Sequence, residues 1–138
     1  MYARIEEFNV PEMASQGETV DASVDVHNEE TLGARVLCQI WDDEDQLLFS
    51  QEAWIGPDST YVFEARFAMP NRDYTVRALT WYYTGEWIFQ DDEYRTIALA
   101  PWWCEYMPRL CELWRRFKSR ALTLIRRRRI AVPSPKGV

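Results

Sequence analysis

Histidine and glycine are scarce in this chain of 138 residues, and both shortages argue against catalysis. The one histidine, His27, has no serine or cysteine nucleophile motif that would use it as a base. The five glycines stand apart from one another, so no glycine-rich loop can cradle a phosphate. We therefore expect no catalytic residues, no cofactor and no enzymatic activity. We interpret His27 as an exposed residue of a turn.

Three cysteines are too few for a disulfide framework. Cys104 and Cys111 lie seven positions apart, so one pair could form, but the odd count leaves one thiol over. A reduced state is the simpler interpretation, with Cys38 buried. The spacing matches no zinc module, and we expect no metal site.

Long apolar runs and a signal sequence are also missing. The N-terminus, MYARIEE, has neither the basic nor the apolar region of a secretory signal. No window reaches the roughly 18 apolar residues of a membrane span. A virion, the cytoplasm or the periphery of a membrane is therefore the expected location, and export by the secretory route is not.

Charge is divided unequally along the chain. Residues 1–99 hold 20 acidic residues against six arginines and no lysine, a formal charge of −14. Residues 100–138 hold eight arginines and two lysines against two glutamates, a formal charge of +8. This asymmetry predicts an acidic body and a basic tail that meet different surroundings.

Apolar residues of the body alternate with polar ones and are interrupted by turn residues at short intervals, which is typical of antiparallel strands. The fold class that follows is all-β: a seven-stranded antiparallel Ig-like β-sandwich over residues 1–99, with a closed barrel as the rival. The alternation is cleanest at Val20, Ala22, Val24 and Val26. The other strands are expected at 3–10, 34–41, 46–55, 61–69, 74–83 and from Glu86 to Leu99 with an interruption at 91–93.

Two acidic runs are candidate calcium ligands, because oxygen donors on converging loops suit that ion. They are Asp42–Asp45, which we expect to form a turn, and Asp91–Glu93. The first lacks the spacing and the glycine of an EF-hand loop. We favour solvated turns whose charge also discourages pairing of exposed strand edges.

Several turn and core motifs of the body resemble a known family. They are residues 11–17, the Val24-Asp25-Val26-His27-Asn28 run, Phe67-Ala68-Met69-Pro70, and Gly85 followed by Asp91-Asp92. Together they resemble the CARDB-like adhesion modules, Ig-like domains of prokaryotic surface proteins and of some viral structural proteins. The resemblance covers about two thirds of the chain and implies a binding or assembly role. It does not extend to the tail.

The tail has a helical pattern in place of alternation. We expect a linker over 100–107, a basic amphipathic helix over 108–129 and an extended end over 130–138. Pro108 suits the first turn of such a helix. The apolar side is formed by Leu110, Cys111, Trp114, Phe117, Ala121, Leu124 and Ile125. In the alternative reading, this side docks on the sandwich, where Leu37, Trp41, Trp54 and Trp81 could form an outer patch, or on a second copy.

These features predict a non-enzymatic structural or interaction module, a component of a virion or another multi-subunit assembly that is attached through its helix. Its partners would be other protein subunits, including copies of itself. A peripheral membrane adaptor and a nucleic-acid tether are the alternatives. The expected apolar contacts are Trp102, Trp103, Leu110, Trp114, Phe117 and Ile125, and the expected contacts to an anionic partner are Arg126, Arg127, Arg128 and Arg129.

Overall fold

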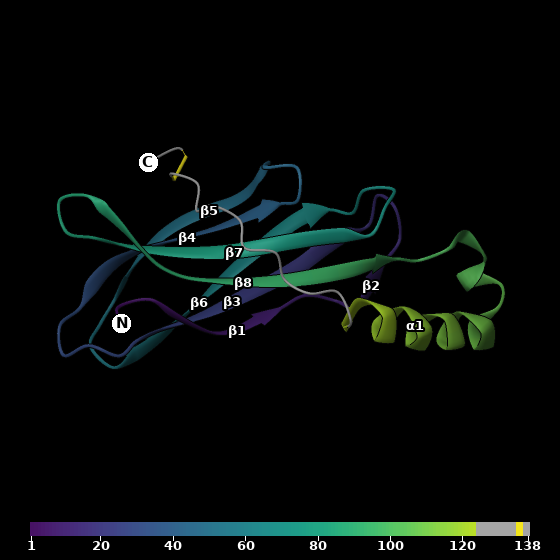
Figure 1. Cartoon of the computed structure of the whole chain (residues 1–138), viewed down its shortest axis with the longest axis horizontal. Coiled ribbons are helices and arrows are strands. Elements are labelled where there is room, and N and C mark those ends of the chain that lie inside the picture. The colour runs from purple at the N-terminus through teal and green to yellow at the C-terminus, as the bar shows by residue number, and fades with distance from the viewer. Residues whose placement is uncertain (124–134, 137–138) are drawn as a thin grey trace.

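The computed structural model describes residues 1–123 and 135–136, and most of these residues lie in strands. Figure 1 labels the elements along the chain. The strands are β1 (Arg4–Asn9), β2 (Met13–Ala14), β3 (Thr19–Asn28), β4 (Ala34–Asp42), β5 (Leu47–Ile55), β6 (Ser59–Ala68), β7 (Tyr74–Tyr83) and β8 (Trp87–Leu99). A 3-10 helix, η1 (Trp102–Glu105), and an α-helix, α1 (Pro108–Thr123), follow.

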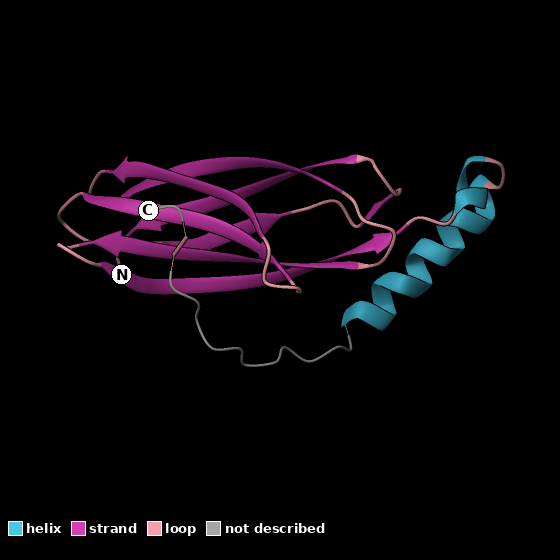
Figure 2. Ribbon diagram, turned by 90° about the horizontal axis from the view of Figure 1, so that it is seen from above, coloured by secondary structure: helices cyan, strands magenta, loops and turns pink. Residues whose placement is uncertain are grey.

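The strands form two sheets that face each other as layers of a sandwich (Figure 2). One sheet has the order β1-β3-β6 and the other the order β2-β8-β7-β4-β5. All pairs are antiparallel except β2 with β8, which is parallel. The expected all-β sandwich with a C-terminal helix is therefore confirmed. The strand count differs from seven because β2, a two-residue strand, is too short to show any alternation.

The core lies between the sheets and is built by the residues that alternate inward. Val24 and Val26 of β3 and Phe63 of β6 are fully buried there. They face Val36 and Ile40 of β4 across the sandwich, in one continuous apolar cluster. Period-two alternation puts every second side chain of a strand on the same face, which is why β3 and β6 could be located from the sequence.

Strand β1 is held to both sheets. It pairs with β3, and its free edge is satisfied by groups of the opposite sheet. The Thr80 hydroxyl donates to the Ala3 carbonyl at 2.7 Å, and the Asp91 carboxylate accepts from the Ile5 amide at 2.9 Å. These bonds cover an edge that would otherwise expose unpaired main-chain groups.

The expected interruption of the last strand at 91–93 is wrong, because β8 runs unbroken from Trp87 to Leu99. The pairing of β8 with β7 shifts its register between Thr80 and Trp81, and the strand continues through this local irregularity. Asp91 turns its carboxylate toward the amides of Ile5 and Asp92, and partial burial raises its pKa. The acidic run Asp91–Glu93 is therefore a hydrogen-bonded part of β8 and not a solvated turn.

The run at 42–45 does form the expected turn between β4 and β5, but it is not simply solvated. Asp42 is buried, and its carboxylate accepts from the amides of Glu44 and Gln46, both at 2.8 Å, and from the Tyr74 hydroxyl at 2.9 Å. Burial and the bond to Asp42 raise the pKa of Tyr74. Asp45 takes a positive φ of 58°, a conformation that aspartate tolerates in tight turns.

Candidate interaction surface

The C-terminal unit formed by η1 and α1 begins where the sandwich ends. Pro101 precedes η1 in an extended conformation, and the Trp103 carbonyl accepts from the amides of Tyr106 and Met107 to close the short helix. Pro108 then starts α1, as the sequence indicates. The stretch expected to be only a linker therefore contains a helical turn.

A disulfide between Cys104 and Cys111 joins η1 to α1. The reduced state that we expected for these two residues is therefore wrong. Their seven-residue separation spans the connection between the two helices, so the bridge fixes the angle at which α1 leaves η1. Cys38 is the thiol left over. It is fully buried, as expected, and burial raises its pKa above the ordinary range, so it stays protonated.

One side of the unit turns toward the sandwich. Trp103, Cys111 and Trp114 are half-buried on this side. Arg115 pairs with Glu12 of the β1–β2 connection at 3.5 Å and with Glu112 at 2.6 Å. The hydrogen bond between Arg115 and Glu112 raises the pKa of Arg115 and lowers the pKa of Glu112. The helix is therefore attached near the end of the sandwich and does not lie across a sheet face (Figures 1 and 2).

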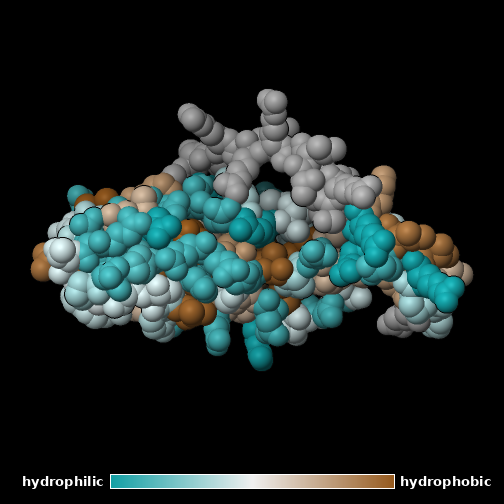
Figure 3. Space-filling model, turned by 90° about the horizontal axis from the view of Figure 1, so that it is seen from below, coloured by the Kyte–Doolittle hydropathy of each residue, from teal (hydrophilic) through white to brown (hydrophobic). Residues whose placement is uncertain are grey.

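The opposite side carries an apolar stripe that faces solvent, which we call the exposed stripe. Leu110, Leu113 and Phe117 follow one another at intervals of three and four, which places them on one side of α1. Trp102 of η1 and Tyr106, in the connection to α1, are exposed as well. The exposed fractions of these residues run from 53% to 81%, and Figure 3 shows hydrophobic residues at this end of the molecule beside a hydrophilic band. The exposed stripe consists of Trp102, Tyr106, Leu110, Leu113 and Phe117.

The structure separates the residues expected to make apolar contacts. Trp102, Leu110 and Phe117 belong to the exposed stripe, whereas Trp103 and Trp114 lie on the half-buried side. Tyr106 and Leu113 were missed. The spacing of Leu113 from Leu110 was readable in the sequence, whereas Tyr106 precedes α1 and has no helical spacing to Leu110. Ile125 and Arg126–Arg129 lie outside the described residues.

The outer patch proposed for docking of the helix exists in part. Leu37, Trp41 and Trp81 lie together on the outer face of the five-stranded sheet, in a buried cluster that is separate from the core. Trp54 is not a member of this cluster and is 69% exposed. The described part of α1 does not cover this face (Figure 2), so the structure does not support the alternative in which the helix docks there.

A groove of about 710 Å³ lies beside Trp54. The indole packs on Gly33, where a Cβ atom would stand 2.5 Å from the ring, so only glycine fits. Arg35 is one of the residues that line the groove. It pairs with Glu52 at 2.5 Å, and its Cζ atom lies 5.3 Å from the centroid of the Tyr83 ring. Because its cation is already engaged by both groups, Arg35 serves here to hold the wall in place.

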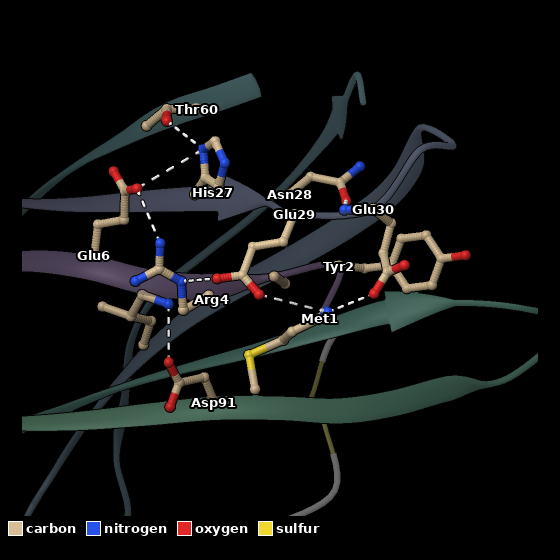
Figure 4. A network of polar contacts seen from close by, with 12 residues as sticks. Met1, Tyr2, Arg4, Glu6, His27, Asn28, Glu29, Glu30, Thr60 and Asp91 are labelled. Carbon is tan, nitrogen blue, oxygen red and sulfur yellow. Dashed lines mark hydrogen bonds and ion pairs between the residues drawn. The ribbon is translucent and has the colours of Figure 1, made fainter. Parts of the chain in front are cut away.

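His27 lies in a polar network around the N-terminal strand (Figure 4). It sits within β3 and is half-buried, so the expectation of an exposed turn residue is wrong. Its Nδ1 atom is 2.8 Å from the Thr60 hydroxyl, and its Nε2 atom is 3.1 Å from Asp58. His27 and Thr60 are register partners, so strand pairing alone accounts for their contact.

The described residues, 1–123 and 135–136, contain no group of three or more histidine, cysteine or acidic side chains placed to hold a metal ion. None of their helices has the length and apolar character needed to cross a bilayer.

Comparison with known proteins identifies the fold. No family model matches the chain, and no curated protein matches its sequence. The CARDB domain of the PF1109 protein from Pyrococcus furiosus, solved with di-metal ions, superposes with a TM-score of 0.59 at 11% identity. The match covers 71% of this chain and 89% of that one. The chain thus shares the fold of the family that its turn motifs resemble.

Other sandwiches match to a similar extent. A chain from the human complex of zinc α2-glycoprotein with prolactin-inducible protein gives a TM-score of 0.55 at 14% identity, over 70% of this chain and 96% of that one. A family 2 glycosyl hydrolase from Bacteroides cellulosilyticus gives 0.50 at 13% identity, over 71% of this chain but only 15% of the enzyme. Identities this low establish the fold alone.

Proposed function

We propose that this protein is a non-enzymatic interaction module, a structural subunit of a virion or another multi-subunit assembly, attached to neighbouring protein subunits through its C-terminal helix. The observation that carries the proposal is the exposed stripe. Five large apolar side chains of the C-terminal unit, three of them on α1, are exposed and are not covered by the sandwich. Contiguous exposed apolar residues of this kind are typical of contact surfaces.

The composition of the exposed stripe favours a protein partner. Trp102 and Tyr106 contact each other edge to face, with centroids 6.4 Å apart, and Leu110, Leu113 and Phe117 share one side of α1. A helix that offers three apolar anchors at intervals of three and four fits an apolar groove of a partner protein. The disulfide and the Arg115–Glu12 pair hold the helix in one orientation before it binds, which reduces the entropy lost on association.

The test replaces three members of the exposed stripe in the full-length chain. Leu110→Gln/Leu113→Gln/Phe117→Gln removes the apolar contacts, and no core residue changes. The matched control is Leu32→Gln, because Leu32 is equally apolar and 68% exposed but lies on the β3–β4 connection. The measurement is co-sedimentation of the chain with large assemblies from its native host. We expect the triple variant to remain at the top of the gradient and the control to sediment as the wild type does.

Normal sedimentation of the triple variant would contradict the proposal. Flotation of the purified chain with phosphatidylcholine–phosphatidylglycerol vesicles, lost in the same variant, would instead support a membrane adaptor. Retention on DNA that weakens steeply with salt and needs Arg126–Arg129 would support a nucleic-acid tether.

A further inference from the structure

The outer face of the five-stranded sheet holds an apolar cluster that the sandwich core does not use. Leu37 and Trp41 of β4 and Leu79 and Trp81 of β7 are buried there. Leu37 pairs with Trp81 in register. In a two-layer sandwich the core requires only the inner faces. A second apolar cluster on an outer face is therefore a surface that another segment covers.

Gln39 is a polar group set within this apolar face, and its side chain is fully buried. Its Oε1 atom accepts from the Trp41 indole at 3.1 Å, and its Nε2 atom donates to the hydroxyl of Ser50, its register partner on β5, at 3.1 Å. The same Nε2 atom also donates to the main-chain carbonyl of Lys136, at 2.8 Å. A buried amide needs an acceptor for each donor, so this face is built to receive a carbonyl from outside the sheet.

Trp41 supplies a second contact to the same segment. The Lys136 ammonium lies 4.8 Å from the centroid of its ring, within the range of a cation–π interaction. The bond to Gln39 fixes the indole in place. Arg77, the register partner of Trp41 on β7, pairs with Asp92 at 3.3 Å, so its charge is balanced within the sheet.

We propose that this outer face is a peptide-binding surface for a lysine-bearing segment, and that its occupant is the C-terminal end of the same chain, Pro135–Lys136. Gln39 binds the main chain of the segment and Trp41 binds its lysine. Proline fixes its own φ at about −65°, so the segment has fewer backbone conformations to lose when it binds. Figure 1 shows this end, in yellow, near β5. The surface is distinct from the exposed stripe, so the inference does not depend on the proposed function.

The first experiment uses the fact that the chain has two lysines, Lys118 and Lys136. Reductive methylation with ¹³C-formaldehyde keeps their charge and gives one NMR signal for each in the full-length chain. We expect the Lys136 signal, identified by its loss in Lys136→Arg, to be shifted upfield by the Trp41 ring. Trp41→Leu should return it to the position of free dimethyl-lysine. Lys118→Arg is the control and should leave it in place. A Lys136 signal at the free position in the wild type would overturn the proposal.

The second experiment leaves the sheet unchanged, so that misfolding cannot imitate the result. Lys136→Glu in the full-length chain weakens the seated end, and a peptide with the sequence of residues 131–138 is added. We expect saturable shifts of the Gln39 side-chain amide and the Trp41 indole signals. A peptide with glutamine in place of lysine should bind several-fold to about thirtyfold more weakly, as loss of a cation–π contact implies. No saturable shift, or equal binding of both peptides, would overturn the proposal.

Dilution distinguishes the end of the same chain from that of a second copy. If the occupant is the chain's own end, the upfield shift of Lys136 stays constant over a hundredfold range of protein concentration. If it appears only as the concentration rises, a second copy supplies the segment, and the assignment to the same chain is overturned.

Discussion

The sandwich and the C-terminal unit place the same kinds of residue in opposite environments. Tyr74 and Phe63 of the sandwich core are almost fully buried, whereas Tyr106 and Phe117 of the C-terminal unit are 74% and 69% exposed. Each inward residue of a strand has a partner on the facing sheet, but a single helix at the end of the sandwich docks only one side. Aromatic residues therefore build the packed core in the first region and remain at the surface in the second.

The largest expected effect is in the core. Phe63→Ala removes a fully buried ring from the centre of the sandwich, and such truncations lower the free energy of unfolding by about 3–5 kcal/mol. Urea unfolding followed by far-UV circular dichroism measures the loss.

Phe117→Ala is the matched comparison in the C-terminal unit. The same chemical change at an exposed position should alter the free energy of unfolding by no more than about 0.5 kcal/mol. A loss comparable with that of Phe63→Ala would mean that the exposed stripe packs against the body in solution, and the contrast between the two regions would fail.

The disulfide gives a prediction of intermediate size. Reduction opens the Cys104–Cys111 loop, and closing a loop of this length is worth about 2–3 kcal/mol. We expect the loss to be confined to the C-terminal unit. Hydrogen exchange should accelerate at the Cys111 amide, which donates to the Met107 carbonyl, and stay unchanged at Leu79 in β7. Equal acceleration at both amides would show that the two regions unfold together.

The sheet layout could be predicted to the extent that one face of each strand is polar. β3 and β6 alternate cleanly, and their positions follow from the sequence. β4 and β7 are buried on both faces near Leu37 and Leu79, so their outward residues resemble core residues. The sequence nevertheless indicated Leu37, Trp41 and Trp81 as an outer patch, and only Leu79 of this cluster was missed. The parallel pairing of β2 depends on contacts far apart in the chain, which local patterns do not encode.

The candidate site could be predicted only in outline. Helical spacing identified the helix and its start at Pro108, but spacing alone does not say which of two apolar sides docks. Trp114 and Leu113 both fit an apolar side, and the structure places Trp114 on the side of the Arg115–Glu12 contact and the disulfide and leaves Leu113 exposed. The contact of Lys136 with Gln39 joins residues 97 positions apart, and no local signal announces it.

The smallest expected effects concern two carboxylates whose pKa values shift in opposite directions. In the sandwich, partial burial raises the pKa of Asp91. The native state therefore holds this proton to a higher pH than the unfolded state does, and the ionised carboxylate costs stability once the pH has risen through the raised pKa. Asp91→Asn should consequently gain stability relative to the wild type between about pH 3 and pH 7, measured by urea unfolding at both values. A relative loss over that interval would show that its hydrogen bonds outweigh burial.

In the C-terminal unit the sign reverses. The bond from Arg115 lowers the pKa of Glu112, so the native state releases this proton at a lower pH than the unfolded state. The resulting stabilisation is present above the unfolded pKa and is lost as the pH falls through the lowered value. Glu112→Gln should therefore weaken the helix near neutral pH and have no effect in strong acid, measured by hydrogen exchange at amides of α1. Because the pair is solvent-exposed, the effect should also shrink in high salt, unlike that of Asp91→Asn. If Glu112→Gln destabilises the helix equally at every pH and salt concentration, Glu112 acts through packing and not through charge.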